Sequence, residues 1–230
     1  TNANGHATLL ACQELHTRLR QRAAQLMGCE PDDVVYEEAR LYRSGDSENS
    51  LSVQELLART PDSDYFNVKT QVELPIQRDV TCFCAQVAEL EVDPETGQVR
   101  LHRFVTAHDV STIFNPIAHQ GQIDGGVIQG IAMALSEELV HEEGRVTTLH
   151  LGDYKLPTAP DIPPLETVLV PVDVGPGPYE AKAIGEMANC SPPAAIANAV
   201  EDAIGVRLFD LPITAEKVYR ALQEKGNRAG

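Results

Sequence analysis

A strong turn signal joins two strand-like stretches in the middle of the chain. The turn is Asp93-Pro94-Glu95-Thr96-Gly97, in which proline fixes φ early and glycine can supply a positive φ late. Apolar residues alternate before the turn, between residues 81 and 91, and the returning strand is predicted over 99–107. The sequence therefore predicts an antiparallel hairpin over 81–107, and any fold of this chain has to include it.

Helical patterns lie on both sides of this hairpin. Residues 6–27 form an amphipathic pattern, and the stretch after Asn115-Pro116 carries an apolar side chain at every fourth position from Ile123 to Leu139. The last helix is predicted to end near Leu222, and the residues from Lys225 onward are predicted to fray. Capping signals mark the helix ends, at Gly28, Ser52 with Glu55, Asn115-Pro116, Ser191-Pro192, Gly205 and Thr214.

The remaining predicted strands are short and irregularly spaced. They are 34–43, the pair 137–141 and 145–150, and a buried strand over 165–170. Strands and helices follow one another without a regular alternation, which favours an α+β fold with mixed or antiparallel sheets and packed helices. Residues 60–80 show the least pattern, so two subdomains are expected, 1–80 and 81–230.

Composition argues against two classes of partner. The 230 residues include 18 basic and 34 acidic side chains, for a formal net charge of −16. This sign argues against a nucleic-acid partner and against an anionic membrane surface, because both select clustered Lys and Arg. No apolar run reaches the length of a membrane span, and a soluble, cytoplasmic protein is expected.

The five cysteines do not suggest a disulfide framework, because their number is odd and their spacing is scattered. Cys82 and Cys84 are two apart in a strand-like run, a spacing that could indicate metal ligands. No second Cys or His pair lies nearby in the sequence, so structural thiols are favoured. We therefore expect no metal ligand from this chain.

The long helix after residue 116 contains four glycines, Gly121, Gly125, Gly126 and Gly130. Each should cost roughly 0.8–1 kcal/mol relative to alanine, so something must approach the helix backbone closely. A ligand is one interpretation, because a helix N-terminus with amide side chains nearby suits an anion. Packing against another element is the other, and composition alone favours it.

A second candidate site is the loop that ends in Lys182-Ala183-Ile184-Gly185-Glu186. It is predicted between a short strand and a helix that starts with proline, where catalytic groups tend to be carried. Glu186 could act as a general base, or it could be a solvated loop carboxylate, and the residues alone favour the second interpretation.

These stretches resemble the molybdenum hydroxylase family, which includes xanthine dehydrogenase and aldehyde oxidoreductase. Lys182 to Glu186 is similar to the family's lysine-x-hydrophobic-glycine-glutamate motif, and residues 191–199 are similar to the alanine-rich helix that follows it. Residues 109–116 and Gly121 to Gly126 resemble the segment that runs alongside the molybdenum cofactor. Further similar blocks are 4–12, 152–157 and 162–164. The resemblance covers essentially the whole chain and matches the C-terminal, molybdopterin-binding part of the family's large subunit.

The resemblance implies a chemistry. In this family a pterin dithiolene holds molybdenum, usually as a cytosine dinucleotide in bacteria, and the protein gives the metal no ligand. The glutamate that matches Glu186 is the general base in the oxidation of a purine, N-heterocycle or aldehyde, with water as the oxygen source. Gln122, Gly121, Gly125 and Lys182 match positions in the cofactor region and are the candidate cofactor-binding residues. The electrons leave through iron–sulfur clusters and commonly FAD, on other domains or subunits.

Some features depart from the family pattern or leave alternatives open. Ser111 replaces a glycine, and Met187-Ala188-Asn189 stands where a proline-rich step often follows the glutamate. The family's glycine-rich cofactor loops have no counterpart in this sequence, so we expect a fragment or split subunit that is inactive in isolation. A non-catalytic assembly subunit is the alternative function. Lys182 could also position the loop or be a surface cation.

Overall fold

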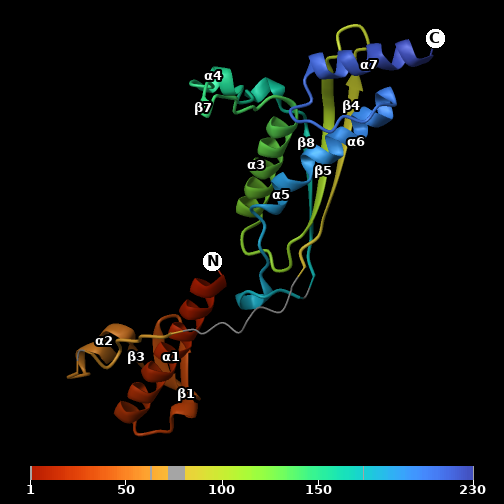
Figure 1. The fold of residues 1–230 in the computed structure, drawn as a ribbon. Helices are drawn as coiled ribbons and strands as arrows, with labels where there is room; N and C mark the ends of the chain where they lie inside the picture. The colour runs from red at the N-terminus through yellow and green to blue at the C-terminus, as the bar shows by residue number, and fades with distance from the viewer. Residues whose placement is uncertain (1, 63, 72–80, 173, 230) are drawn as a thin grey trace. The chain divides into compact units, whose positions relative to one another are not determined.

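The computed structural model describes residues 2–62, 64–71, 81–172 and 174–229. The chain divides into two compact units, Thr1–Arg78 and Asp79–Gly230. The first unit packs the long helix α1 (Asn2–Met27) and the short helix α2 (Val53–Ala58) with a three-stranded sheet (Figure 1). The strands of this sheet are β1 (Val34–Glu37), β2 (Arg40–Arg43) and β3 (Asp46–Ser52), all antiparallel.

Capping in the first unit follows the sequence closely. Gly28 ends α1 with φ +65°, as a glycine C-cap requires. The Ser52 side chain accepts a hydrogen bond from the Glu55 backbone N–H, and the Glu55 carboxylate accepts one in return from the Ser52 backbone. The core of this unit consists of Leu19, Ala23, Ala24, Val34, Leu41 and Leu56.

The single strand predicted over 34–43 is wrong, because the chain turns back inside it. Glu38 and Ala39 join β1 to β2 with φ values of +46° and +60°. Two successive positive φ angles make the tight hairpin turn that usually carries Asn or Gly. Because Glu38 and Ala39 are neither Asn nor Gly, nothing in the sequence indicates the turn, and the strand-like pattern predicts one continuous strand.

The second unit is built on a mixed sheet in the order β4-β5-β8. The hairpin of β4 (Cys84–Val92) and β5 (Val99–Asp109) confirms the predicted turn, and β8 (Leu165–Val170) adds parallel to β5. The helices α3 (Pro116–Leu135) and α6 (Pro192–Ile204) pack on one face of the sheet, with the short helix α5 (Met187–Cys190) beside them (Figure 1). The other elements of the unit are β6 (His141–Glu142), β7 (Arg145–Val146), α4 (Leu151–Tyr154), the 3₁₀ turns at Ala159–Asp161 and Pro178–Glu180, and α7 (Ala215–Ala229). The fold is α+β, as predicted.

Side chains on the sheet alternate between a covered and an uncovered face. The covered face holds Phe104 in the core with Ile123, Val127, Ile196 and Val200. The apolar residues of the outer face, as we call it, are Phe83, Ala85, Val87, Val105, Ala107, Val168 and Val170, and the charged side chains of Glu89, Arg103 and Glu166 lie on the same face. Phe83 is 68% exposed and Val87 63% exposed, so the apolar residues that revealed the strand at 81–91 lie largely on this face. The strand predicted at 165–170 is confirmed as β8, but it is not buried, because Val168 and Val170 are each more than 40% exposed.

Two helix predictions differ from the structure in their C-terminal ends. The Asn115 side chain accepts a hydrogen bond from Ala118 N–H at 3.0 Å, which confirms the start of α3. However, α3 ends at Leu135, and residues after Ser136 lead into the short β6–β7 hairpin, so Leu139 is not helical. The last helix runs to Ala229 instead of fraying from Lys225. The Lys225 ammonium donates to the Ile204 carbonyl at 2.7 Å, a long-range contact that supports this extension.

Gly97 should be the most sensitive position of the central hairpin. Its φ is +74°, and a Cβ there would lie 2.6 Å from the Tyr219 backbone nitrogen of α7. We expect Gly97→Ala to lower the free energy of unfolding by roughly 2–4 kcal/mol, from backbone strain and overpacking together. Gly226→Ala, in the open part of the same helix α7, should instead be neutral or stabilising. Urea unfolding of both variants checks this, and equal effects would contradict it.

Candidate functional site

The loop of residues 179–186, which we call the Glu186 loop, is tied to the end of β5 by several contacts. Ser111 and Ala181 form an isolated antiparallel bridge. The Thr112 hydroxyl donates to the Tyr179 carbonyl at 2.5 Å, and Lys182 Nζ donates to Asp109 Oδ2 at 2.5 Å. These contacts hold the loop although it contains little regular structure.

Lys182 is part of a nearly buried ion pair. Its side chain is 4% exposed and that of Asp109 is 13% exposed. The interpretation of Lys182 as a surface cation is therefore wrong. A buried pair of this kind fixes geometry more than it adds stability, because desolvation offsets much of the attraction. The Lys182 ammonium binds the protein itself, at the base of the Glu186 loop.

Ser111 shows why a glycine is usual at this position of the family pattern. Its φ is +55°, in the left-handed region that favours glycine. The Ser111 hydroxyl donates to the Val172 carbonyl at 2.6 Å, and the side chain is 1% exposed. This buried hydrogen bond compensates part of the cost of the backbone conformation, so the departure from glycine leaves the connection to the loop in place.

The four glycines of α3 fall into two stripes with different surroundings. A Cβ at Gly126 would lie 2.7 Å from the Ala188 Cβ, and one at Gly130 would lie 2.6 Å from Pro192 Cγ. These two glycines let α5 and the start of α6 pack against α3. At Gly121 and Gly125, no described atom outside the helix's own backbone lies within 4 Å of an added Cβ. Packing therefore explains Gly126 and Gly130, whereas Gly121 and Gly125 face open space. We call Gly121 and Gly125 the open glycine stripe.

Gln122 and Glu186 lie at the same end of α3. The Gln122 Oε1 atom would be 3.9 Å from a Cβ on Gly185, the residue before Glu186. Glu186 is exposed and directly precedes α5, and its side chain makes no capping hydrogen bond. The structure thus brings the loop that carries this exposed carboxylate beside an amide of α3, the helix that also bears the open glycines.

A row of polar side chains beneath α5 has no clear signal in the sequence. On the covered face of the sheet, Cys84 pairs in register with His108, and Gln86 with Thr106. Thr106 and His108 are 1% and 0% exposed. Burial lowers the pKa of His108, which favours the neutral imidazole. Polar residues at alternate positions of a strand usually indicate a solvated face. Only the packed structure shows that Thr106 and His108 are buried.

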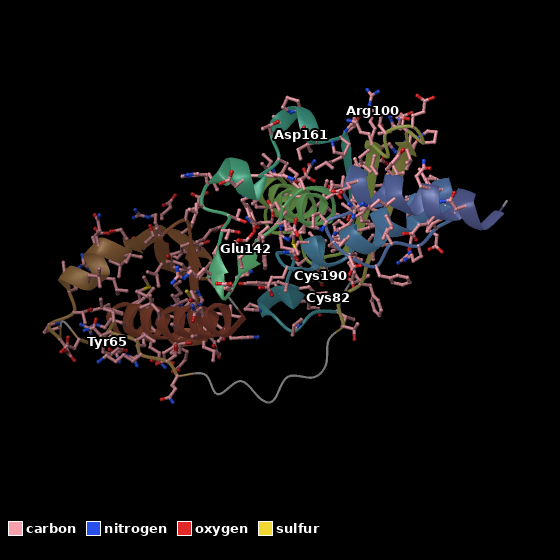
Figure 2. All side chains as sticks on the ribbon, turned by 45° about the horizontal axis from the view of Figure 1, so that its top comes forward. Tyr65, Cys82, Arg100, Glu142, Asp161 and Cys190 are labelled. Carbon is pink, nitrogen blue, oxygen red and sulfur yellow. The ribbon has the colours of Figure 1, made fainter. Side chains whose placement is uncertain are left out.

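The cysteines of the second unit are free thiols. Cys84 is half-buried, with its Sγ near the Met187 carbonyl of α5. Cys190, labelled in Figure 2, is exposed at the end of α5. Among the residues that the structure describes, no group of three or more His, Cys, Asp or Glu side chains could hold a metal ion. Within the same residues, no helix is both long and apolar enough to cross a membrane.

One hollow of the second unit lies away from these residues. It has a volume of about 700 Å³ and is lined by the turn end of β5, the C-terminal end of α3 and residues 155–164. Arg100 and Asp161, labelled in Figure 2, both line it. The Glu186 loop joins β5 at the other end, at Asp109 to Thr112, so this hollow is not part of the candidate site.

Comparison with known proteins agrees with this arrangement. Residues 1–163 match the molybdopterin cofactor-binding domain. The chain belongs to the molybdenum hydroxylase family. It is 30% identical over 232 residues to the 6-hydroxypseudooxynicotine dehydrogenase complex subunit gamma of Paenarthrobacter nicotinovorans, covering 95% of this chain and 29% of that protein. A second relative is the putative xanthine dehydrogenase molybdenum-binding subunit XdhA of Escherichia coli, 36% identical over 146 residues, with 63% of this chain and 19% of that protein covered.

A solved structure of this family shares the fold. The quinoline 2-oxidoreductase of Pseudomonas putida matches with a TM-score of 0.74 and 27% identity, over 92% of this chain and 28% of that chain. This molybdenum hydroxylase chain thus spans less than a third of the length of each relative.

Proposed function

We propose that this chain is the C-terminal, catalytic portion of a molybdopterin-dependent hydroxylase, with Glu186 as its general base. The observation that carries the proposal is the exposed Glu186 carboxylate, whose loop lies beside Gln122 in the N-terminal half of α3. When bound, a molybdopterin group supplies oxidation chemistry that takes the product oxygen from water. The alternative, a non-catalytic assembly subunit, requires no free carboxylate at this place.

The residues at the N-terminal end of α3 fit such a group. Gly121 and Gly125 leave the helix backbone accessible where a side chain would fill the space. The positive end of the dipole of α3 lies in this half of the helix and favours an anionic ligand, such as the phosphates of a pterin dinucleotide. We propose that these glycines and the Gln122 amide contact the cofactor, as its cytosine dinucleotide. Lys182 supports the same site through Asp109, by fixing the loop beside it.

Glu186 has the properties that a general base needs. Its carboxylate is accessible and has no competing hydrogen bond within the cap of α5. It is carried on a loop whose base is fixed by the Lys182–Asp109 pair. A carboxylate so placed can accept a proton at one of its oxygens while the substrate is oxidised. We propose a purine, N-heterocycle or aldehyde substrate, and the relatives named for xanthine and quinoline support the heterocycles.

The proposal requires partners. The matched relatives are more than three times as long as the aligned region, and one of them is named as a subunit of a complex. We propose that the remaining large-subunit segment covers the outer face of the β4-β5-β8 sheet. Exposed apolar patches of this kind usually mark contact surfaces. Iron–sulfur and FAD-containing domains or subunits would then accept the electrons.

Molybdenum content tests this proposal. We expect the 230-residue chain purified alone to contain far less than one molybdenum per chain, because the glycine stripe encloses only one side of a ligand. Co-production with the remaining large-subunit segment should bring the content to about one. Stoichiometric molybdenum in the chain alone would contradict the need for that segment. An assembled complex free of molybdenum would contradict the function itself.

A further inference from the structure

A chain of polar groups crosses the covered face of the sheet beneath α5. It consists of Gln86 on β4 and of Thr106 and His108 on β5, next to the hydrophobic core of the unit. Buried polar groups cost stability unless they are hydrogen-bonded. The presence of this polar chain next to the core therefore needs an explanation, and we look for it in the element that its hydrogen bonds hold in place.

One assignment of donors and acceptors gives the side-chain hydrogens of both Gln86 and Thr106 an acceptor. Gln86 Nε2 lies 3.1 Å from Thr106 Oγ1 and 3.1 Å from the Ala188 carbonyl, so both of its hydrogens are used. The Thr106 hydroxyl accepts from Gln86, and its own hydrogen is directed to His108 Nε2, 2.6 Å away. In this assignment His108 is a neutral ring with its proton on Nδ1, and Nδ1 and Gln86 Oε1 are buried atoms with no hydrogen-bond partner among the described residues. A flipped Gln86 amide would place two oxygens against each other at Ala188.

The far end of this chain holds α5. Ala188 lies within this four-residue helix, which begins directly after Glu186 and lies beside α3 (Figure 1). A second contact comes from Cys84, whose Sγ is 3.8 Å from the Met187 carbonyl and 3.5 Å from Ser191 Oγ. A helix of one turn is not stable by itself. Side chains of β4 therefore contribute to fixing its place.

We infer that Gln86 is a positioning residue for Glu186, with its amide held in the required orientation by Thr106 and the Nδ1-protonated tautomer of His108. This inference rests on the proposed function of Glu186 as the general base. A general base has to lie within hydrogen-bonding reach of the proton that it accepts. A displacement of about 1 Å at a reacting group can cost about 100-fold in rate. Gln86 acts on the C-terminal side of Glu186, whereas the Lys182–Asp109 pair acts on the N-terminal side.

Hydrogen exchange of the 230-residue chain tests the structural part of this inference. We expect Gln86→Met to make the backbone amides of residues 187–191 exchange roughly two- to tenfold faster, with the amides of α7 unchanged. Thr106→Val should have the same local effect if the methionine variant does not fold. Gln223→Met, the same change on the exposed side of α7, is the matched control. Uniformly faster exchange, or none, would overturn the inference.

The tautomer of His108 gives an independent readout. The ¹⁵N chemical shifts of its imidazole should show a protonated Nδ1 and an unprotonated Nε2 near neutral pH. In Thr106→Val the hydroxyl donor is lost, and the Nδ1-protonated form should lose its preference. A proton on Nε2 in the unsubstituted chain would overturn the hydrogen-bond assignment.

In the assembled enzyme, Gln86→Met should lower kcat by about 10- to 100-fold with KM changed by less than about threefold, because only the base is displaced. The molybdenum content should stay unchanged. A large effect of Glu186→Gln with no effect of Gln86→Met would overturn this inference and leave the proposed function standing. No effect of Glu186→Gln would overturn the proposed function instead.

Discussion

Replacing Glu186 by glutamine is expected to lower kcat of the assembled enzyme by about 10²- to 10⁴-fold, the contribution of a positioned general base. Glutamine has nearly the same shape, but its amide does not accept a proton at neutral pH. The Glu186 side chain is exposed and caps no helix. Its loss should therefore leave the stability of the chain unchanged within about 0.5 kcal/mol. A loss of turnover without a loss of stability is the signature of a chemical role.

Two measurements and one control complete this prediction. KM should change little, because a base that acts only in the transition state contributes little to substrate binding. Molybdenum content should be that of the unsubstituted enzyme. Glu180→Gln makes the same change in an exposed carboxylate of the same loop and should retain full kcat. Turnover unaffected by Glu186→Gln would instead support the non-catalytic assembly subunit.

Turns and helix caps could be predicted from the sequence wherever the residues of one short segment determine them. The capping box of Ser52 and Glu55, the cap at Asn115 and the turn before Gly97 are of this kind, because each is satisfied within a few residues. The turn at Glu38 and Ala39 lacked such a signal, since neither residue is typical of a positive φ. The end of α7 depends on a contact between Lys225 and Ile204, 21 residues apart.

The candidate site likewise has features that the sequence predicted and features that depend on contacts between distant segments. A motif identified Glu186, Gln122 and the glycines, but the sequence could not show which glycines pack and which stay open. That distinction depends on α5, formed by residues 187–190 more than 50 positions away. The partner of Lys182 is Asp109, 73 residues earlier, so whether Lys182 was a surface cation could not be decided from its neighbours. Contacts between distant segments carry the information that local patterns lack.

Alanine substitutions in the two glycine stripes of α3 should have opposite effects on stability. At Gly121 and Gly125 an added methyl group meets open space, and replacing a helical glycine should stabilise the chain by roughly 0.5–1 kcal/mol for each site. At Gly126 and Gly130 the methyl group would lie within 3 Å of Ala188 or Pro192. Overpacking there should cost roughly 1–3 kcal/mol, and thermal unfolding of the four single variants measures the difference.

The same four variants separate packing from cofactor binding. If the open stripe contacts the cofactor, Gly121→Ala and Gly125→Ala should lower the molybdenum content of the assembled enzyme at least severalfold, although they make the chain more stable. A structural defect cannot explain that combination, because stability and cofactor content would then fall together. Such parallel losses are expected for Gly126→Ala and Gly130→Ala, which displace α5. Full molybdenum content in Gly121→Ala and Gly125→Ala would show that the open stripe faces solvent or a protein partner instead, and the proposed cofactor contacts would have to be abandoned.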